Sequence, residues 1–184
     1  MQSTNLNRRA FLRGKSPRLE PDTIRPPWAV KASLFIEKCT RCDNCIEACP
    51  EEIITRGDGG YPEINFLKGE CTFCAKCVDA CESNVFIDLP KDKEAESIVK
   101  TIPPWNLEIS FANTCLSVNA VVCRACADNC DEQAINFLLK IGGISEPQFT
   151  QKDCTGCGAC ISVCPVRAVQ IKPFIFQQID QNQS

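Results

Sequence analysis

The chain has 184 residues, 44% of them hydrophobic, and a formal net charge of −3. This length allows one or two domains, and the ten phenylalanines and two tryptophans favour two small cores over one large core. The chain has no histidine and no phosphate-binding G-x-x-x-x-G-K-[ST] motif, so we do not expect an enzyme. No stretch approaches 18 consecutive apolar residues, so we do not expect a membrane-spanning protein.

Residues 1–31 are basic, and we expect a mostly extended N-terminal arm. The stretch from Asn7 to Arg13 resembles a twin-arginine export motif, but a charged, proline-containing segment follows it in place of an apolar run. We therefore expect a cytoplasmic protein, since thiols stay reduced in that compartment. The arm is either a solvated tail or a docking segment for an anionic partner. Its basic residues are not interleaved with aromatic ones, so nucleic acid is not an expected partner.

Residues 32–89 contain the first two of four cysteine runs, and we expect them to form the first structural unit. The runs are Cys39, Cys42, Cys45 and Cys49, and Cys71, Cys74, Cys77 and Cys81. Their C-x2-C-x2-C-x3-C spacing is that of [4Fe–4S] clusters in bacterial ferredoxins. Two residues between cysteines let a tight loop reach three iron corners with its N–H groups turned toward the sulfurs. We expect the fourth cysteine on the first turn of a short helix.

Apolar stretches connect the runs of this first unit. Residues 53–54 and 61–66 flank a glycine cluster, which predicts a hairpin of two short strands. Residues 85–87 are readable as a closing edge strand. Residues 90–104 begin with a charged stretch and are expected to form a linker or a short helix.

Residues 105–176 repeat this order, and residues 177–184 form a polar tail. The third and fourth runs are Cys115, Cys123, Cys126 and Cys130, and Cys154, Cys157, Cys160 and Cys164. A hairpin is predicted around Gly142 and Gly143, and a closing strand over 168–171. Seven residues separate Cys115 from Cys123, which predicts a bulged loop. Either Cys115 still reaches an iron corner, or the third site holds a [3Fe–4S] cluster or is empty.

In two-cluster ferredoxins the fourth cysteine of a run ligates the neighbouring cluster. That rule predicts four crossed sets of ligands. They are Cys39, Cys42, Cys45 and Cys81; Cys71, Cys74, Cys77 and Cys49; Cys115, Cys123, Cys126 and Cys164; and Cys154, Cys157, Cys160 and Cys130. The predicted fold is therefore α+β, with two tandem two-[4Fe–4S] ferredoxin-like units of short strands and helices that the clusters stabilise.

Disulfides and zinc are the alternatives for so many cysteines. An even cysteine count also fits a disulfide framework, but such frameworks rarely repeat one tight spacing four times. Zinc sites usually separate two C-x2-C pairs by a longer spacer and often recruit histidine, which this chain lacks. The spacing favours iron–sulfur clusters over both.

Several segments outside the cysteine spacing carry a more specific resemblance. They are Arg8-Arg9, Ile24-Arg25-Pro26-Pro27-Trp28, Cys39-Thr40-Arg41-Cys42-Asp43-Asn44-Cys45, Arg56-Gly57-x-Gly59-Gly60-Tyr61-Pro62 and Val122-Cys123-Arg124-x-Cys126. With them, nearly the whole chain resembles the NapF-type ferredoxins encoded with bacterial periplasmic nitrate reductases. The resemblance implies a cytoplasmic accessory protein that acts on the precursor of the catalytic subunit before export, by supplying or reducing its cluster. A general electron carrier between redox partners is the alternative function.

Removing the iron should unfold the chain, because two thin cores bury too little apolar surface to be stable without metal. The measurement is far-ultraviolet circular dichroism before and after anaerobic chelation. A cluster-free sample with a near-native spectrum would contradict this prediction.

Overall fold

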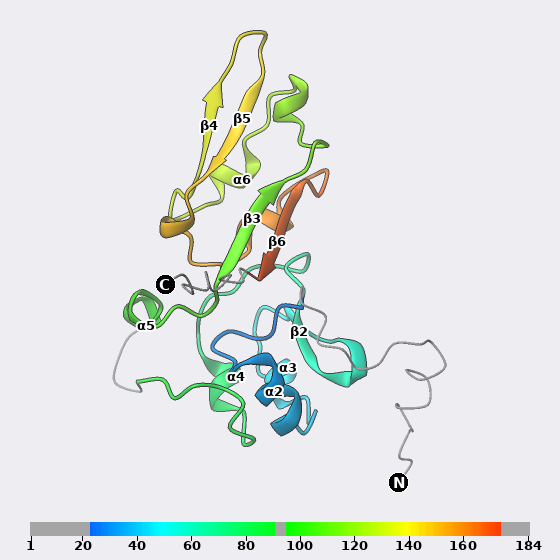
Figure 1. The fold of residues 1–184 in the computed structure, drawn as a ribbon, viewed down its shortest axis with the longest axis vertical. Coiled ribbons are helices and arrows are strands. Elements are labelled where there is room, and N and C mark those ends of the chain that lie inside the picture. Colours follow the sequence, from blue (N-terminus) through cyan, green and yellow to red (C-terminus); the bar gives the residue numbers. More distant parts are fainter. Residues whose placement is uncertain (1–22, 91–94, 174–184) are drawn as a thin grey trace, which may run out of the picture.

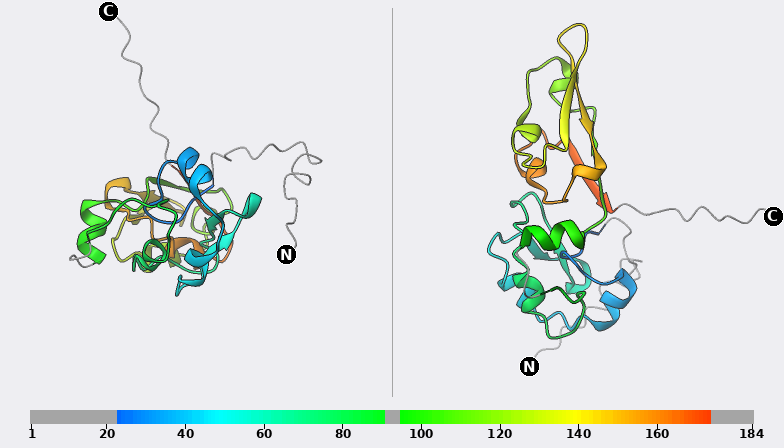
Figure 2. Two further views of the ribbon diagram at one scale, coloured as in Figure 1. Left: turned by 90° about the horizontal axis from the view of Figure 1, so that it is seen from below. Right: turned by 90° about the vertical axis from the view of Figure 1, so that its left-hand side faces the viewer.

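The sixteen cysteines lie in four runs that interrupt the chain, so its helices and strands are short. The computed structural model describes residues 23–90 and 95–173. The fold is α+β, as predicted, and its two lobes are stacked along the long axis (Figures 1 and 2). The first lobe comprises residues 23–90 with helix α5, and the second comprises residues 105–173. The twin-arginine-like motif and the polar tail lie outside the described residues.

The first lobe contains the predicted hairpin. Strands β1 (Ile54–Arg56) and β2 (Pro62–Ile64) pair in antiparallel register, with Ile54 opposite Ile64. A short 3-10 turn, η1 (Asp58–Gly60), joins them, and Gly59 and Gly60 have φ angles of +65° and +80°. Glycine adopts positive φ without a side-chain clash, so this turn accounts for the glycine cluster between the two strands.

Short helices make up most of the remaining regular structure of the first lobe. They are α2 (Ala32–Lys38), α3 (Asn44–Glu47), α4 (Lys76–Asp79) and α5 (Ala95–Thr101). Helix α2 buries Phe35 completely, and this ring makes an edge contact with Phe86, with 6.3 Å between centroids. The closing strand predicted over 85–87 is reduced to a single antiparallel bridge between Phe86 and Ala29.

The second lobe has two longer antiparallel pairs. Its strands are β3 (Leu107–Phe111), β4 (Ile135–Leu139), β5 (Ser145–Phe149) and β6 (Val169–Pro173). Its helical turns are η2 (Ser117–Asn119), α6 (Ala125–Asp128), η3 (Gln151–Asp153) and α7 (Ala159–Ser162). The β4–β5 pair is the predicted hairpin and projects from the end of the molecule (Figure 1). Strand β6 is the predicted closing strand and pairs with β3.

In all four cysteine runs a one-turn helix begins one residue before the third cysteine. Helices α3, α4, α6 and α7 contain the third cysteine of their runs, which are Cys45, Cys77, Cys126 and Cys160. The fourth cysteine lies two residues after each helix ends. The expectation that the fourth cysteine occupies the first turn was therefore wrong, because the helix begins one residue before the third cysteine and is only four residues long.

The main hydrophobic core runs through both lobes. Ile53 and Ile54 from the first lobe and Ile109, Ile135 and Val169 from the second belong to one buried cluster. The prediction of two separate cores was thus wrong. The reason is that residues from both lobes are buried together at their boundary, which the number of aromatic residues cannot reveal.

Two Pro-Pro-Trp motifs, Pro26-Pro27-Trp28 and Pro103-Pro104-Trp105, interlock between the lobes; we call this contact the clasp. The Trp28 indole donates a hydrogen bond to the Ile102 carbonyl at 2.9 Å, and the Trp105 indole donates one to the Arg25 carbonyl at 2.8 Å. The Trp28 backbone N–H also donates to the Pro104 carbonyl at 2.9 Å. Each tryptophan therefore bonds to the residue that precedes the other motif. Residues that were expected in the arm pack here against the body.

Replacing Trp28 with alanine should lower the free energy of unfolding by about 3–5 kcal/mol, the usual cost of removing a buried large aromatic side chain. Trp28 is only 2% exposed and packs with Ile98 and Val99 of α5. Ile141→Ala is the control, since that side chain is fully exposed at the tip of the β4–β5 hairpin. Denaturant unfolding of the cluster-containing protein measures both. Equal midpoints would show that the clasp contributes little.

Candidate metal centres

The first, second and fourth cysteine loops share an unusual backbone conformation. Each places two residues between its cysteines at positive φ. The pairs are Arg41 and Asp43, Phe73 and Ala75, and Gly156 and Gly158. Left-handed residues in a tight loop turn successive backbone N–H groups to one side, which creates a concavity that favours negative charge.

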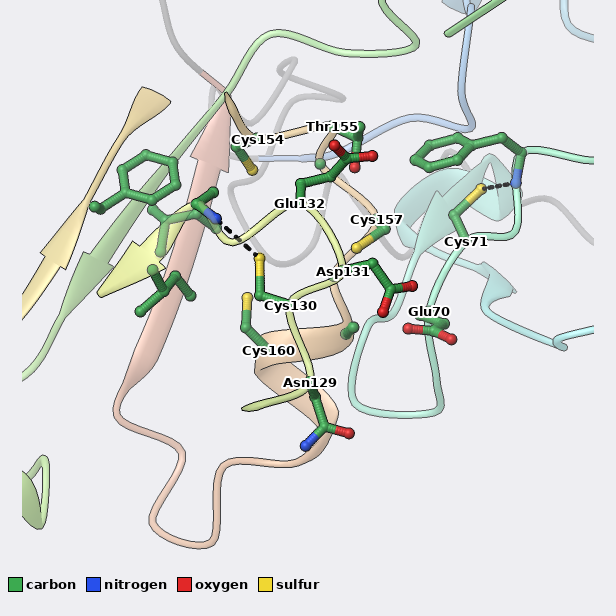
Figure 3. A pocket seen from close by; sticks show the side chains of 18 of the residues that line it. Glu70, Cys71, Asn129, Cys130, Asp131, Glu132, Cys154, Thr155, Cys157 and Cys160 are labelled. Carbon is green, nitrogen blue, oxygen red and sulfur yellow. Dashed lines mark hydrogen bonds between the residues drawn. The ribbon is translucent and has the colours of Figure 1, made fainter. Parts of the chain in front are cut away.

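The first left-handed residue of each of these loops donates its N–H to the first thiol of the run. The Phe73 N–H lies 3.4 Å from the Cys71 sulfur, and this bond is drawn in Figure 3. The N–H groups of Arg41 and Gly156 bond to Cys39 and Cys154, the first thiols of their own runs, in the same way. Burial raises the pKa of these two thiols, and the backbone hydrogen bonds oppose part of that rise. Hydrogen bonds to sulfur are one of the means by which proteins tune iron–sulfur clusters.

In the second lobe the fourth cysteines also accept backbone hydrogen bonds. The Ala134 N–H lies 3.3 Å from the Cys130 sulfur, and the Ala168 N–H lies 3.2 Å from the Cys164 sulfur. Both donors come four residues after the cysteine, at the point where the chain enters or approaches a strand. The strands thereby fix the thiols that follow α6 and α7.

Thiols from two different runs meet in the first lobe. Burial, with a further contribution from the charges of Cys39, Cys81 and Cys42, raises the pKa of Cys45 to about 11. Cys81 comes from the second run and also acts on Cys39. The structure therefore brings the fourth cysteine of the second run to the first three thiols of the first run.

The reciprocal group lies around the second run. Burial and the charges of Cys74, Cys49 and Cys157 raise the pKa of Cys71 to about 12. The pKa of Cys77 is raised as well, first by burial and then by neighbouring thiols that include Cys49. Cys49, the fourth cysteine of the first run, thus lies with the thiols of the second.

Figure 3 shows the corresponding group in the second lobe, where Cys130, Cys154, Cys157 and Cys160 line one cavity. Burial raises the pKa of Cys160, and the charges of the other three thiols add to that effect. Cys130 belongs to the third run and the others belong to the fourth. The cavity also includes Cys71 of the first lobe.

The remaining group contains the stretched third run. Burial raises the pKa of Cys126 to about 11, and the charges of Cys115 and Cys164 contribute. Cys115 is buried, and the amide of Asn119 donates to its carbonyl at 2.7 Å. That bond holds the seven-residue loop against the site. Cys123, the other cysteine of this group, is half-buried.

This donor set fits an iron–sulfur cluster. Closely placed, half-buried thiolates repel one another, and metal cations remove that repulsion. Soft thiolate ligands select iron–sulfur clusters, zinc or copper(I), and N–H groups directed at the sulfurs are a feature of cluster loops. Over residues 23–90 and 95–173, no group of three or more histidine, cysteine or acidic side chains is arranged to hold a single metal ion.

The charges around the thiol groups differ between the lobes. Arg25 is half-buried, with its guanidinium 5.7 Å from the Tyr61 ring centroid, and Arg41 lies 5.1 Å from the same ring on the first cysteine loop. Both arginines act on Cys39. The cavity of the second lobe is instead lined by the carboxylates of Asp131 and Glu132, together with that of Glu70 from the first lobe (Figure 3).

The loops, the four thiol groups and the two lobes define an iron–sulfur protein of the dicluster ferredoxin class. The 4Fe–4S dicluster domain family matches residues 38–86 and, in a second match, residues 121–168. These matches confirm the predicted kind of cofactor and the tandem arrangement. The second begins after Cys115, so it does not include that residue.

Full-length relatives narrow the class to a family. The ferredoxin-type protein NapF of Haemophilus influenzae is 43% identical over 178 residues, which cover 92% of this chain and 95% of that protein. NapF of Escherichia coli K12 is 41% identical over 163 residues, covering 89% and 92%. The ferredoxin-type protein NapG of E. coli K12 is 28% identical over 160 residues. The chain belongs to the NapF family of ferredoxin-type proteins, as the sequence predicted.

This family membership establishes an iron–sulfur protein of the accessory or electron-transfer kind. Ferredoxin-type iron–sulfur proteins are typically electron carriers. Among the described residues, no helix is long and apolar enough to cross a membrane.

Sequence reasoning missed two kinds of residue at these centres. The left-handed positions were overlooked because only the fourth loop marks them with glycines, Gly156 and Gly158, whereas the first two loops use other residues. The position of Arg25 near Cys39 was missed because these two residues are separated along the chain. The repeated Pro-Pro-Trp motif was the available signal that residues 26–28 belong to the body.

Replacing Cys126 with serine should remove iron from the second lobe and leave the first lobe largely loaded, because its thiol neighbours are in the second lobe. Cys115→Ser should convert or empty the third site alone. Iron analysis and electron paramagnetic resonance (EPR) measure both. Ser117→Ala is the matched control, since Ser117 is buried near Cys115 but supplies no thiol. Equal iron loss from both lobes would contradict the assignment.

Proposed function

We propose that the chain binds four [4Fe–4S] clusters, one at each group of thiols. The proposed ligands are Cys39, Cys42, Cys45 and Cys81; Cys71, Cys74, Cys77 and Cys49; Cys115, Cys123, Cys126 and Cys164; and Cys154, Cys157, Cys160 and Cys130. The charge effects between these thiols support the crossed assignment, because in each group the fourth cysteine of one run acts on the third cysteine of the paired run. When bound, such clusters supply one-electron redox chemistry.

Cys115 is the proposed ligand that departs from the bacterial ferredoxin spacing, and its burial supports its inclusion. The side-chain amide of Asn119, within the seven-residue loop, donates hydrogen bonds to the backbone carbonyls of Asn113 and Cys115. These bonds fix the backbone at Cys115. A thiol held in place beside Cys126 is available as the fourth ligand of that site. We therefore propose a complete third cluster rather than a three-iron one.

We further propose that the protein acts in the cytoplasm on the precursor of the periplasmic nitrate reductase catalytic subunit, where it supplies or reduces an iron–sulfur cluster before export. Membership in the NapF family carries this proposal. The protein's own thiol groups then hold redox cofactors for the partner, and the chain performs no catalysis of its own. The basic segment before residue 23 is the proposed docking arm.

A general electron carrier is the second candidate. The two thiol groups within each lobe are adjacent, which favours this function. The charge of Cys45 acts on Cys77 in the first lobe, and the charge of Cys126 acts on Cys160 in the second. Closely placed redox centres serve a carrier as well as an accessory protein. The two functions differ in whether a specific precursor binds.

Anaerobic pull-down of the nitrate reductase precursor distinguishes them. The full chain should retain the precursor, and removing residues 1–22 should weaken retention, because that segment carries five basic residues against two acidic ones. The deletion must stop at residue 22, since Ile24 and Trp28 are buried in the body. A variant with Arg8, Arg9 and Arg13 changed to glutamine keeps the length and tests the charge.

The outcomes separate the alternatives. Retention that is unchanged by either variant would remove the docking role of the arm while keeping the precursor as partner. No retention by the full chain would favour the electron carrier. Iron analysis of the same samples should give four irons for each of four clusters, and a lower value would contradict the proposed number.

A further inference from the structure

The second and fourth cysteine loops belong to different lobes, yet they contact each other directly. The backbone N–H of Cys71 donates a hydrogen bond to the carbonyl of Cys157 at 2.8 Å. Both cysteines also line the same cavity. Figure 3 shows Cys71 on the first-lobe chain facing Cys157 across the cavity. We call this contact the joint.

Side chains from both lobes hold the joint closed. Phe66 of the first lobe is 4% exposed and packs edge-on against Trp105, with 5.7 Å between ring centroids. The same ring lies over Gly158, where a Cβ atom would come within 2.0 Å of its Cδ1 atom. Glycine at 158 therefore serves two needs, since the position has a φ of +86° and leaves no space for a side chain.

The joint connects two pairs of thiol groups into one row. Within the first lobe, helices α3 and α4 contact each other, and they carry Cys45 of the first group and Cys77 of the second. Within the second lobe, helices α6 and α7 contact each other, and they carry Cys126 of the third group and Cys160 of the fourth. The joint places the second group beside the fourth, so the order along the molecule is first, second, fourth and third. This order differs from the order of the runs in the sequence.

We infer that the joint brings the second and fourth sites close enough to interact electrostatically, so that the charge at one site changes the reduction potential of the other. The inference rests on the proposal that both groups hold clusters. The facing thiols are only partly exposed, and charges in such places are screened less by salt than surface charges. One added electron then makes a second electron on the other side of the joint less favourable. Phe66 and Gly158 act as positioning residues for this coupling.

The test compares the cluster-containing full chain with its Phe66→Ala variant. EPR spectra of the protein, fully reduced by a low-potential reductant, should show magnetic interaction between centres across the joint in the wild type. The variant should lose part of that interaction, and the separation between the reduction potentials of the second and fourth sites should shrink. Phe35→Ala is the control, because Phe35 is also buried but packs beside the first thiol group, in a cluster that contains neither Cys71 nor Cys157. It should leave both readouts unchanged.

A second variant keeps the test valid if Phe66→Ala loses iron. Gly158→Ala should disturb the joint by clashing with the Phe66 ring, and the disturbance should be smaller when it is combined with Phe66→Ala, which frees the space. An alanine at position 158 is strained by its positive φ whether residue 66 is phenylalanine or alanine. This strain therefore cancels when the effects of Gly158→Ala in the two proteins are compared. A smaller loss in the double variant therefore assigns the effect to the contact itself.

Three results would overturn the inference. The first is that Phe66→Ala and Phe35→Ala change the EPR spectrum equally. The second is that Gly158→Ala has the same effect with and without the Phe66 ring, and the third is that the fully loaded wild type shows no interaction between the lobes. Iron content separates this failure from that of the proposed function. A wild type without clusters at the second and fourth sites would overturn both, whereas a fully loaded one with unchanged spectra would overturn the coupling alone.

Discussion

Thiolates cannot be kept side by side in a partly buried site unless positive charge lies among them, and this constraint shapes the whole chain. Burial and mutual charge raise the pKa of thiols in every one of the four groups, so without metal they favour the protonated form. Cluster iron removes the repulsion and displaces those protons. The one-turn helices, the left-handed loop residues and the inward N–H groups all serve to deliver sulfurs to such sites. Little of the chain is left to form regular structure independently of them.

The two lobes repeat one plan but do not stand apart. Their repeated Pro-Pro-Trp motifs exchange indole hydrogen bonds, and Phe73 of the second cysteine loop makes edge contacts with both tryptophans, at 6.3 and 6.1 Å between centroids. The aromatic residues that close the lobe boundary therefore also support a cysteine loop. Packing and thiol positions depend on the same side chains at this boundary. A substitution there should therefore affect the second and fourth sites more than the first and third.

Much of this arrangement follows from spacing, and the remainder depends on contacts between distant residues. The cysteine intervals predicted four sites and the kind of cofactor, and the glycine pairs predicted both hairpins. The position of the one-turn helices was missed by a few residues, since the run is too short to show helical periodicity. The clasp and the joint could not be predicted, because Trp28 finds its partner 74 residues away and Cys71 bonds to Cys157. A repeated three-residue motif hints that two segments are equivalent but not that they touch.

The clasp also bears on how the chain matures as it leaves the ribosome. Domains usually fold as units from the N-terminal end during synthesis. Here the indole and the backbone N–H of Trp28 donate to the carbonyls of Ile102 and Pro104, which are made after the whole first lobe. Until those residues emerge, the Trp28 indole, which packs edge-on against Phe73 of the second cysteine loop, lacks its carbonyl partner. The packing of the first lobe is therefore completed only when the residues that lead into the second lobe have been made.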